Sequence, residues 1–414
     1  MRSAPVLAVF AVCIGLGCGR PAETPDQQAE RLHRDALVLD THADTTPRFQ
    51  DPEYDFSARH PREQGQIDLP RAREGGLDVQ FWSIYVGKVE GDGRAIREAM
   101  ERIDAVWELE RRFPNDIAIA TDVASIRRGV AKGKLVSLMG VEGGHMIEGK
   151  LAVLRDFQRL GVRYMTLTHS FHTDWADSSG TGEPLPPGHG GLTAFGEEVV
   201  REMNRLGMMV DISHVSDETF WDALAVSRAP VLASHSSCRA VFDHPRNLSD
   251  DMLRALAAKG GVVMINFYPG YTDAEAAPAI REWMARHGAE IARLREAHRG
   301  DLRAMSTALR AIAAADPVPK GSLARLLDHF DHALRVAGED HVGLGSDFDG
   351  VPSMPVELDE VSELPNLTRG LLERGWSEAV VRKLLGENLL RMLAEVEHVS
   401  ARLVRAPAAP PNPR

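Results

Sequence analysis

The sequence predicts an α/β fold, a (β/α)8 or TIM barrel with a helical insertion between its seventh and eighth strands. Eight short runs are almost continuously apolar, as parallel strands buried on both faces are. Helical patterns separate most of these runs, and strand alternating with helix is typical of such a barrel. The length of 414 residues, without a composition break in the central part, suits one large barrel.

The predicted strands are rich in Val, Ile, Leu or Met. In chain order they are Ala36–Thr41, Leu77–Val86, Leu135–Val141, Tyr164–Thr168, Met208–Ile212, Val231–Ser234, Gly261–Phe267 and His341–Gly345. Helical stretches fall between several of them, at Ala95–Arg112, Ala152–Leu160, Ala194–Leu206, Asp217–Ala225 and Asp250–Ala258. Two final helices, Ser377–Leu385 and Asn388–His398, are expected to close the domain.

The interval between the seventh and eighth strands is unusually long. Ala274–Leu334 is rich in Arg and Ala and has a helical period. We expect it to form an inserted helical subdomain or lid, and a longer pair of covering helices is the alternative. If the segment covers the site, it would narrow or shift the range of substrates.

Both ends of the chain lie outside the predicted barrel, which spans residues 32–398. Residues 1–17 contain an apolar stretch too short for a membrane span and have the order of a signal peptide. Cys18 follows a small residue, as at a bacterial lipoprotein cleavage site, so we expect lipid attachment there, with plain secretion as the alternative. Residues 18–31 are predicted to be a linker, and 399–414 a disordered Pro-rich tail. An exported protein of the bacterial periplasm or cell envelope is the expectation.

Charge and cysteine content argue against a nucleic-acid partner and against a fold held by disulfides. The net charge is −12 and no basic stripe is present, so no nucleic-acid partner is expected. Two of the three cysteines, Cys13 and Cys18, fall in the targeting segment, which excludes a disulfide framework. The oligomeric state stays open, a homodimer included.

Histidine and acidic side chains follow six of the eight predicted strands. They stand at the carboxyl ends, where the active site of such a barrel lies. His42 and Asp44 are two residues apart on an extended segment and project to the same face. The strand-end residues are His42 and Asp44, Glu142, His169, His214, His235, and Asp347 with Asp349.

These residue types indicate a metal centre. Imidazole and carboxylate without thiolate suit Zn²⁺, with Mn²⁺ or Co²⁺ as substitutes. Five ligands are too many for one catalytic zinc that keeps a position open for water. Two zinc ions that share a bridging Glu142 fit better, with His42 and Asp44 completing one ion, and His214 and His235 the other. Asp40 is either a hydrogen-bond partner of these ligands or an ordinary buried polar residue.

The expected chemistry is hydrolysis. Two divalent ions lower the pKa of a shared water towards about 7, which gives a hydroxide that can attack a carbonyl. A carboxylate that takes a proton from the water can deliver it to the leaving amine. Asp347 is placed for this role, while Asp349 has a weaker claim to orientation or a turn. His169 can donate to the tetrahedral oxyanion, and support of its loop is the alternative.

Taken together, the strand-end histidines and acids and the short motifs around them resemble those of the membrane (renal) dipeptidases. These are binuclear zinc peptidases with a barrel of the metal-dependent hydrolase type. The resemblance covers nearly all of Leu32 to Val396, and the motifs are specific in combination. They are DTHAD at 40–44, GVEGG at 140–144, LTHS at 167–170, DISHVS at 211–216, SHSS at 234–237, RNLSD at 246–250 and GSDFDG at 345–350.

The resemblance implies a role for each site residue. His169 is expected near the substrate carbonyl, and Arg246 is expected to hold the C-terminal carboxylate of a dipeptide, which a guanidinium can grip bidentately. Tyr271 is expected to line the pocket, and Asp347 matches the acid that this family carries after strand eight. The implied zinc ligands are His42, Asp44 and Glu142 on one ion, and Glu142, His214 and His235 on the other.

The leading hypothesis is a zinc-dependent metallodipeptidase. It would hydrolyse the peptide bond of free dipeptides, L-Xaa-D-Xaa included, as the resemblance implies. A related binuclear metal amidohydrolase acting on N-acyl amino acids, lactams or lactones is the alternative. A lipid-anchored binding protein without catalysis is a third hypothesis, disfavoured because no expected ligand is missing and Asp347 is present.

Overall fold

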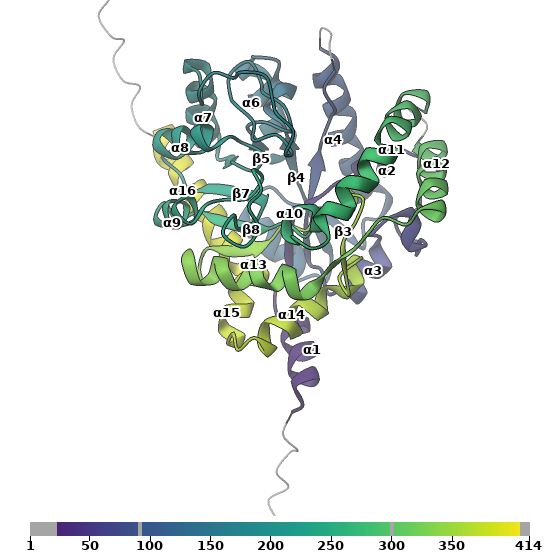
Figure 1. Ribbon diagram of the computed structural model, residues 1–414. Coiled ribbons are helices and arrows are strands. Elements are labelled where there is room, and N and C mark those ends of the chain that lie inside the picture. Colours follow the sequence, from purple (N-terminus) through teal and green to yellow (C-terminus); the bar gives the residue numbers. More distant parts are fainter. Residues whose placement is uncertain (1–22, 90–92, 299–301, 406–414) are drawn as a thin grey trace, which may run out of the picture.

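The computed structural model describes residues 23–89, 93–298 and 302–405. Eight parallel strands form a closed barrel, because β10 pairs with β1 and β2 pairs with β4. Helices surround this barrel (Figure 1), so the predicted fold class is confirmed. In barrel order the strands are β1 (Leu39–Ala43), β2 (Val79–Ile84), β4 (Leu135–Glu142), β5 (Val162–Thr166), β6 (Met209–Asp211), β7 (Val231–Ser236), β8 (Val262–Ile265) and β10 (Val342–Leu344).

One strand beyond the predicted eight belongs to the same sheet. β3 (Ile117–Ile119) pairs with the first residues of β4, whereas β5 pairs with β4 only from Met139 onward. β3 therefore covers the edge at the start of β4. It has three residues, two of them only half-buried, and so short a run gives no clear strand pattern.

The outer helices begin where the sequence offers caps. Thr193, Ser216 and Ser249 each precede a helix and accept a hydrogen bond from an N–H group of its first turn. The helices around the barrel are α2 (Thr46–Phe49), α3 (Leu69–Glu74), α4 (Arg94–Arg112), α5 (Val123–Val130), α6 (Leu151–Arg159), α7 (Ala194–Leu206), α8 (Asp217–Val226), α9 (Asp250–Ala258), α14 (Leu364–Glu373) and α15 (Glu378–Arg382), with the short turns η1 (Arg62–Gln64), η2 (Gly144–Ile147), η3 (Val361–Glu363) and η4 (Lys383–Glu387).

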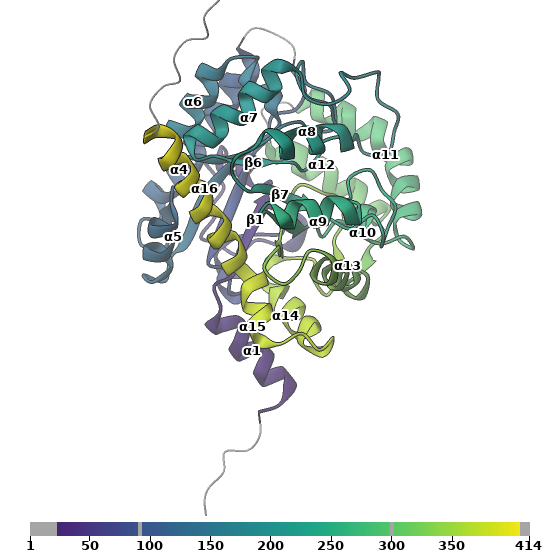
Figure 2. The same cartoon turned by 90° about the vertical axis from the view of Figure 1, so that its left-hand side faces the viewer.

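The last helix closes the amino-terminal end of the barrel. α16 (Asn388–Arg405) buries Leu389 and Leu393 in one hydrophobic cluster with Leu39 and Val79, which are the first residues of β1 and β2. Figure 2 shows α16 running from α15 towards α7. The carboxyl ends of the strands lie at the opposite end of the barrel, which α16 leaves uncovered.

The long segment after β8 contains an inserted pair of helices, but the insertion ends earlier than the predicted boundary at Leu334. α10 (Pro269–Thr272) leads into α11 (Ala277–Ala297) and α12 (Leu302–Ala315), which share a small cluster of Trp283, Ile291 and Ile312. α13 (Leu323–Val336) was predicted to belong to the insertion but packs on α9, β8 and β10. Its apolar stripe makes it a wall helix of the barrel, so the insertion ends before Leu323. Two short strands, β9 (Gly321–Ser322) and β11 (Pro355–Val356), pair beside it.

Both predicted terminal segments are shorter than expected. α1 (Pro25–Asp35) lies largely inside the predicted linker 18–31, where Thr24 and Gln27 form a capping box, and it packs against α14. At the other end α16 continues to Arg405, because Val399 is buried, although a tail was predicted from 399. The predicted signal peptide, Cys18 and residues 406–414 lie outside the described residues. Within the described ranges, no helix has the length and apolarity that a membrane span requires.

A buried cation ties α3 to the segment before α14. Arg71 is 1% exposed, and its Nε donates to Oδ2 of Asp68 (2.7 Å) while Nη1 donates to Oε2 of Glu360 (2.8 Å). Asp68 is itself fully buried and caps α3 by accepting from the N–H of Arg71 (3.0 Å). Removing the cation would leave a buried carboxylate without its counter-charge, which is among the costliest single changes.

We therefore expect Arg71→Met to lower the free energy of unfolding by about 3 kcal/mol. Arg73→Met is the matched control, since Arg73 lies on the same helix but its side chain is 57% exposed and pairs with Asp116 at the surface. That change should cost less than about 1 kcal/mol. Denaturant unfolding at neutral pH measures both, and equal losses in the two variants would contradict the role given to Arg71.

Candidate metal centre and substrate pocket

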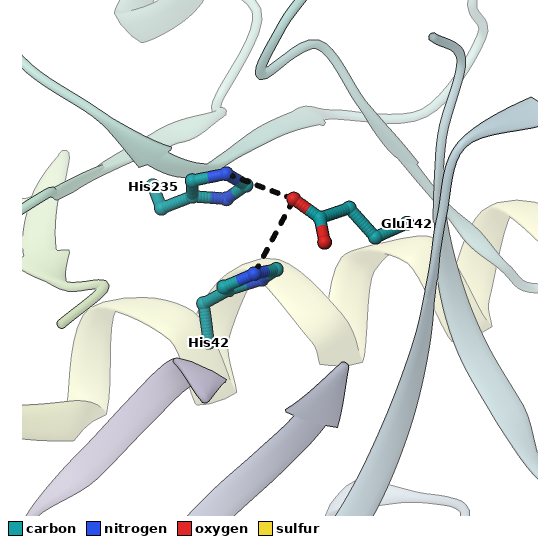
Figure 3. A group of neighbouring side chains, drawn as sticks. All are labelled: His42, Glu142 and His235. Carbon is teal, nitrogen blue, oxygen red and sulfur yellow. Dashed lines mark ion pairs between the residues drawn. The ribbon is translucent and has the colours of Figure 1, made fainter. Parts of the chain in front are cut away.

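One carboxylate oxygen lies at the centre of the strand-end cluster. Glu142, the last residue of β4, is 4% exposed, and its Oε1 faces the Nε2 atoms of four histidines. The distances are 3.4 Å to His42, 3.6 Å to His169, 3.1 Å to His214 and 3.3 Å to His235. Figure 3 shows the carboxylate of Glu142 at one side of the rings of His42 and His235, facing one nitrogen of each, while the rings stack with centroids 3.9 Å apart. Histidines from four separate strand ends thus meet at one atom at the end of a fifth strand.

A second acidic group lies beside this centre. Nε2 of His42 is 3.3 Å from Oδ2 of Asp44, and ligand atoms of His42, Asp44 and Asp347 all lie within 4.8 Å of one another. Two backbone hydrogen bonds hold the ends of β1 and β10 together here, from the N–H of Asp347 to the His42 carbonyl (3.1 Å) and from the N–H of Asp44 to the Phe348 carbonyl (2.8 Å). The structure therefore brings every predicted metal ligand to one site, with Asp347 next to them.

Two of these residues have a costly backbone conformation. His214 has φ +66° and Asp347 has φ +68°, in the left-handed region that residues with a Cβ seldom adopt. Such strain persists where the surrounding structure imposes it, and it concentrates at functional sites. Glu148, Asp349 and Glu357 share this conformation, so the strain is not confined to the cluster, but at His214 and Asp347 it coincides with the converging side chains.

Hydrogen bonds behind the imidazoles fix which nitrogen faces the centre. The Tyr164 hydroxyl donates to the Thr41 carbonyl (3.1 Å) and so accepts from Nδ1–H of His42 (2.9 Å). Ser234 acts in the same way, because its hydroxyl donates to Asp211 (2.6 Å) and accepts from Nδ1 of His235 (2.8 Å). Both imidazoles therefore direct the lone pair of Nε2 towards Glu142.

This arrangement fits a bound cation. With neutral imidazoles, two lone pairs and a carboxylate oxygen repel one another unless positive charge lies between them, and the buried Nε2 of His42 has no hydrogen-bond partner in the described part of the chain. Burial opposes charge on His42, but Tyr164, Glu142 and Asp44 outweigh it and raise its pKa well above the usual value, so the site favours positive charge at Nε2, which either a proton or a metal ion in its place can supply. Burial lowers the pKa of His214 and His235 well below normal, so both remain neutral, as metal ligands must be.

Asp347 is held as a carboxyl that exchanges protons near neutral pH. Burial raises its pKa to about 7; His42 opposes this shift, whereas the negative charges of Asp44 and Glu142 add to it. The amide of Asn266 donates to Oδ2 of Asp347 (2.9 Å) and fixes its orientation. A general acid or base works best when its pKa is close to the working pH.

The predicted substrate residues flank the centre. Nε2 of His169 is 3.6 Å from Oε1 of Glu142, and its buried Nδ1 has no hydrogen-bond partner among the described residues. Arg246 is 3% exposed; its Nη2 donates to the His235 carbonyl (3.1 Å), but its Nε and Nη1 have no partner in the described part of the chain. The guanidinium lies 5.5 Å from the ring centroid of Tyr271, on α10. A buried guanidinium with unpaired donors calls for an anionic ligand.

Two of the acids expected near the site have structural contacts instead. Asp40 accepts from the N–H and the hydroxyl of Ser346 (2.7 Å each) and from Gln80 (2.9 Å), and none of its described hydrogen bonds goes to a predicted ligand. It therefore fixes the segment that precedes Asp347. Asp349 accepts from Thr45 (2.7 Å) and pairs with Arg48 (3.1 Å), which assigns it to the turn after β10.

Some contributors to the site were missed. Tyr164 and Asn266 each orient a site residue, although neither type suggests a ligand. Gly140 makes room for Tyr164, since a Cβ at that position would lie 1.9 Å from Cζ of the tyrosine ring. A glycine inside a strand often marks such a close approach, and it was the one sequence signal for this contact.

Comparisons with known proteins place the chain in a family. The model of the membrane dipeptidases, peptidase family M19, matches residues 26–406. Dipeptidase aclJ of Aspergillus oryzae is 38% identical over 352 residues, which cover 83% of this chain and 73% of that protein.

Solved structures agree with this match. The probable dipeptidase PvdM of Pseudomonas aeruginosa is 28% identical with a TM-score of 0.77, covering 91% of this chain and 99% of that one. A metallo peptidase of Rhodobacter sphaeroides, solved with a phosphinate mimic of the dipeptide L-Ala-D-Ala, is 26% identical with a TM-score of 0.68, covering 87% of this chain and 100% of that one. With its barrel and its cluster of histidines and carboxylates, the chain belongs to the membrane dipeptidase family of metallopeptidases, M19.

Proposed function

We propose that the protein is a zinc dipeptidase that hydrolyses the peptide bond of free dipeptides, L-Xaa-D-Xaa included. The observation that carries this proposal is the position of one carboxylate oxygen of Glu142 within 3.1–3.6 Å of four imidazole nitrogens, beside the acidic pair of Asp44 and Asp347. The Rhodobacter sphaeroides relative solved with an L-Ala-D-Ala mimic supports the extension to a D-residue at the second position.

The donor set supports two zinc ions with Glu142 as the bridge. Imidazole and carboxylate are the ligands that zinc takes in hydrolytic sites, and no thiolate is present. When bound, such ions supply positive charge that polarises a carbonyl and lowers the pKa of a water. The residues that would hold them are His42 and Asp44 on one side of Glu142, and His214 and His235 on the other.

The chain's own side chains provide binding and proton transfer. Arg246 binds the C-terminal carboxylate of the dipeptide through its unpaired Nε and Nη1. That contact places the peptide carbonyl at Glu142, next to His169, whose imidazole can donate to the developing oxyanion. Asp347 accepts a proton from the attacking water at Oδ1 or Oδ2 and passes it to the leaving amine, while Asn266 keeps the carboxyl in place.

We expect Glu142→Gln to reduce bound zinc from two ions per chain to one or fewer and to lower kcat/KM by at least about a hundredfold. A carboxamide keeps the shape of the side chain but supplies no charge to bridge two ions. Elemental analysis after dialysis measures the metal, and Glu197→Gln on the surface of α7 is the control. A single tightly bound ion per wild-type chain would contradict the bridged pair.

Replacing Arg246 with Ala should raise KM for dipeptides by about a hundredfold or more, because a buried charge-assisted contact to the carboxylate is lost. The substitution should not change the rate of any turnover of lactones or lactams that lack a free carboxylate. Initial rates on matched L,L- and L,D-dipeptides, with chelation as a blank, test this. Failure of the zinc-loaded wild type to cleave any dipeptide, with turnover of lactones or lactams instead, would favour the amidohydrolase alternative.

Asp347→Asn should leave two ions bound and lower kcat by about 10²–10⁴, since the amide cannot carry the proton. Asp349→Asn is the comparison, because that carboxylate lies two residues further on and contacts Thr45 and Arg48 rather than the centre. It should affect thermal stability more than kcat. Near-normal turnover by the Asp347 variant would remove this residue from proton transfer.

A further inference from the structure

A fully buried histidine joins the two segments that carry Arg246 and Tyr271. His329 lies on α13, which packs on α10, and it is 0% exposed. Its Nδ1 accepts a hydrogen bond from the backbone N–H of Cys238 (3.0 Å), and its Nε2 donates to the backbone carbonyl of Thr272 (3.0 Å). Cys238 and Thr272 are both buried, and a buried backbone group without a partner is costly. The imidazole therefore links the chain after β7 to the end of α10.

This link requires a neutral imidazole. The Cys238 N–H can donate to Nδ1 of His329 only when that nitrogen carries no proton, so the ring proton lies on Nε2 and points to Thr272. Burial lowers the pKa of His329 to about 4, which keeps the ring neutral at ordinary pH. One rigid ring thus supplies an acceptor to one segment and a donor to the other, which neither lysine nor arginine can do.

The Cys238 end of this link leads to Arg246. Cys238 and Leu248 form a parallel β-bridge, which two backbone hydrogen bonds of 2.8 Å hold together. Arg246 lies two residues before Leu248, and its Nη2 donates to the carbonyl of His235 on β7 (3.1 Å). A displacement of Cys238 would therefore move the backbone that carries the guanidinium.

The Thr272 end leads to Tyr271, its neighbour on α10, where a second buried side chain joins the same two segments. Asn247 directly follows Arg246 and is 1% exposed. Its Nδ2 donates to the backbone carbonyl of Tyr271 (2.8 Å). His329 and Asn247 thus connect the segment of Arg246 to α10 at two neighbouring points.

These two connections fix the spacing between a guanidinium and an aromatic ring. The guanidinium of Arg246 lies 5.5 Å from the ring centroid of Tyr271. Building on the proposed dipeptidase activity, we propose that His329 and Asn247 are positioning residues, which hold Arg246 and Tyr271 at the spacing that the C-terminal carboxylate of the substrate requires. They act on substrate binding and not on the metal centre, so their loss should change KM rather than kcat.

Two substitutions of His329 separate its hydrogen bonds. The amide of His329→Asn lies near the place of Nδ1 and can still accept from Cys238, whereas the amide of His329→Gln lies near the place of Nε2 and can still donate to Thr272. Each variant should bind as much zinc as wild type and raise KM for Ala-Ala about fivefold to tenfold, the size of one buried hydrogen bond, with kcat within about threefold of wild type. Asn247→Ala should give the same split.

A double-mutant cycle distinguishes positioning from a general loss of stability. In an Arg246→Ala background the guanidinium is already gone, so adding His329→Asn should raise KM by less than about twofold further. His332→Asn is the matched control, because His332 lies on the same helix but its Nε2 contacts Asp250 (2.6 Å) on α9. It should leave KM at the wild-type value.

Three results would overturn the proposal. KM can stay at its wild-type value in the His329 and Asn247 variants, kcat and bound zinc can fall while KM does not rise, or His329→Asn can act as strongly in the Arg246→Ala background as alone. If the His329 variants do not fold, the KM of Asn247→Ala decides. Any of these results, with Ala-Ala cleaved by wild type, refutes only the positioning role, whereas no cleavage of any dipeptide by zinc-loaded wild type refutes the dipeptidase itself.

Discussion

The contact on which the site depends is the convergence of four imidazoles on one oxygen of Glu142. His42 and His235 lie in the last residues of β1 and β7, His169 and His214 follow β5 and β6, and the glutamate ends β4. No local segment could therefore assemble the group alone. Closure of the barrel fixes these distances, because each strand end is held by hydrogen bonds to its neighbours. A shift of one residue in any strand would turn a ligand away from the centre. The register of the barrel strands therefore decides whether the side chains that could hold a metal converge.

Around this contact the protein maintains features that oppose folding. Buried acids lie close together, His214 and Asp347 have left-handed backbones, and the guanidinium of Arg246 is buried with unpaired donors. Each feature is unfavourable by itself. An opposite charge beside the buried acids and beside Arg246 offsets their cost, whereas the backbone strain is held by the surrounding structure. The compensating stability comes from elsewhere, from the apolar barrel core and from α16 across its far end.

The barrel and the cluster of histidines and carboxylates at its carboxyl end could be predicted from sequence, because both leave a pattern along the chain. The strands are continuous apolar runs, and His42 with Asp44 follows from the alternation of side chains along a strand. Tyr164 and Asn266 leave no such record, since their roles depend on which strands become neighbours. β3 and the end of the insertion before Leu323 were missed for other reasons. A three-residue strand is too short to recognise, and a helix of the barrel wall has the same period as an inserted helix.

The contact between Gly140 and Tyr164 has an evolutionary consequence. The tyrosine ring occupies the space that a side chain at position 140 would need, and its hydroxyl orients His42. Neither residue can change first without a loss, because a larger residue at 140 displaces the ring and a smaller one at 164 frees the histidine. The two positions should therefore change only as a pair, and lineages that keep His42 should keep both.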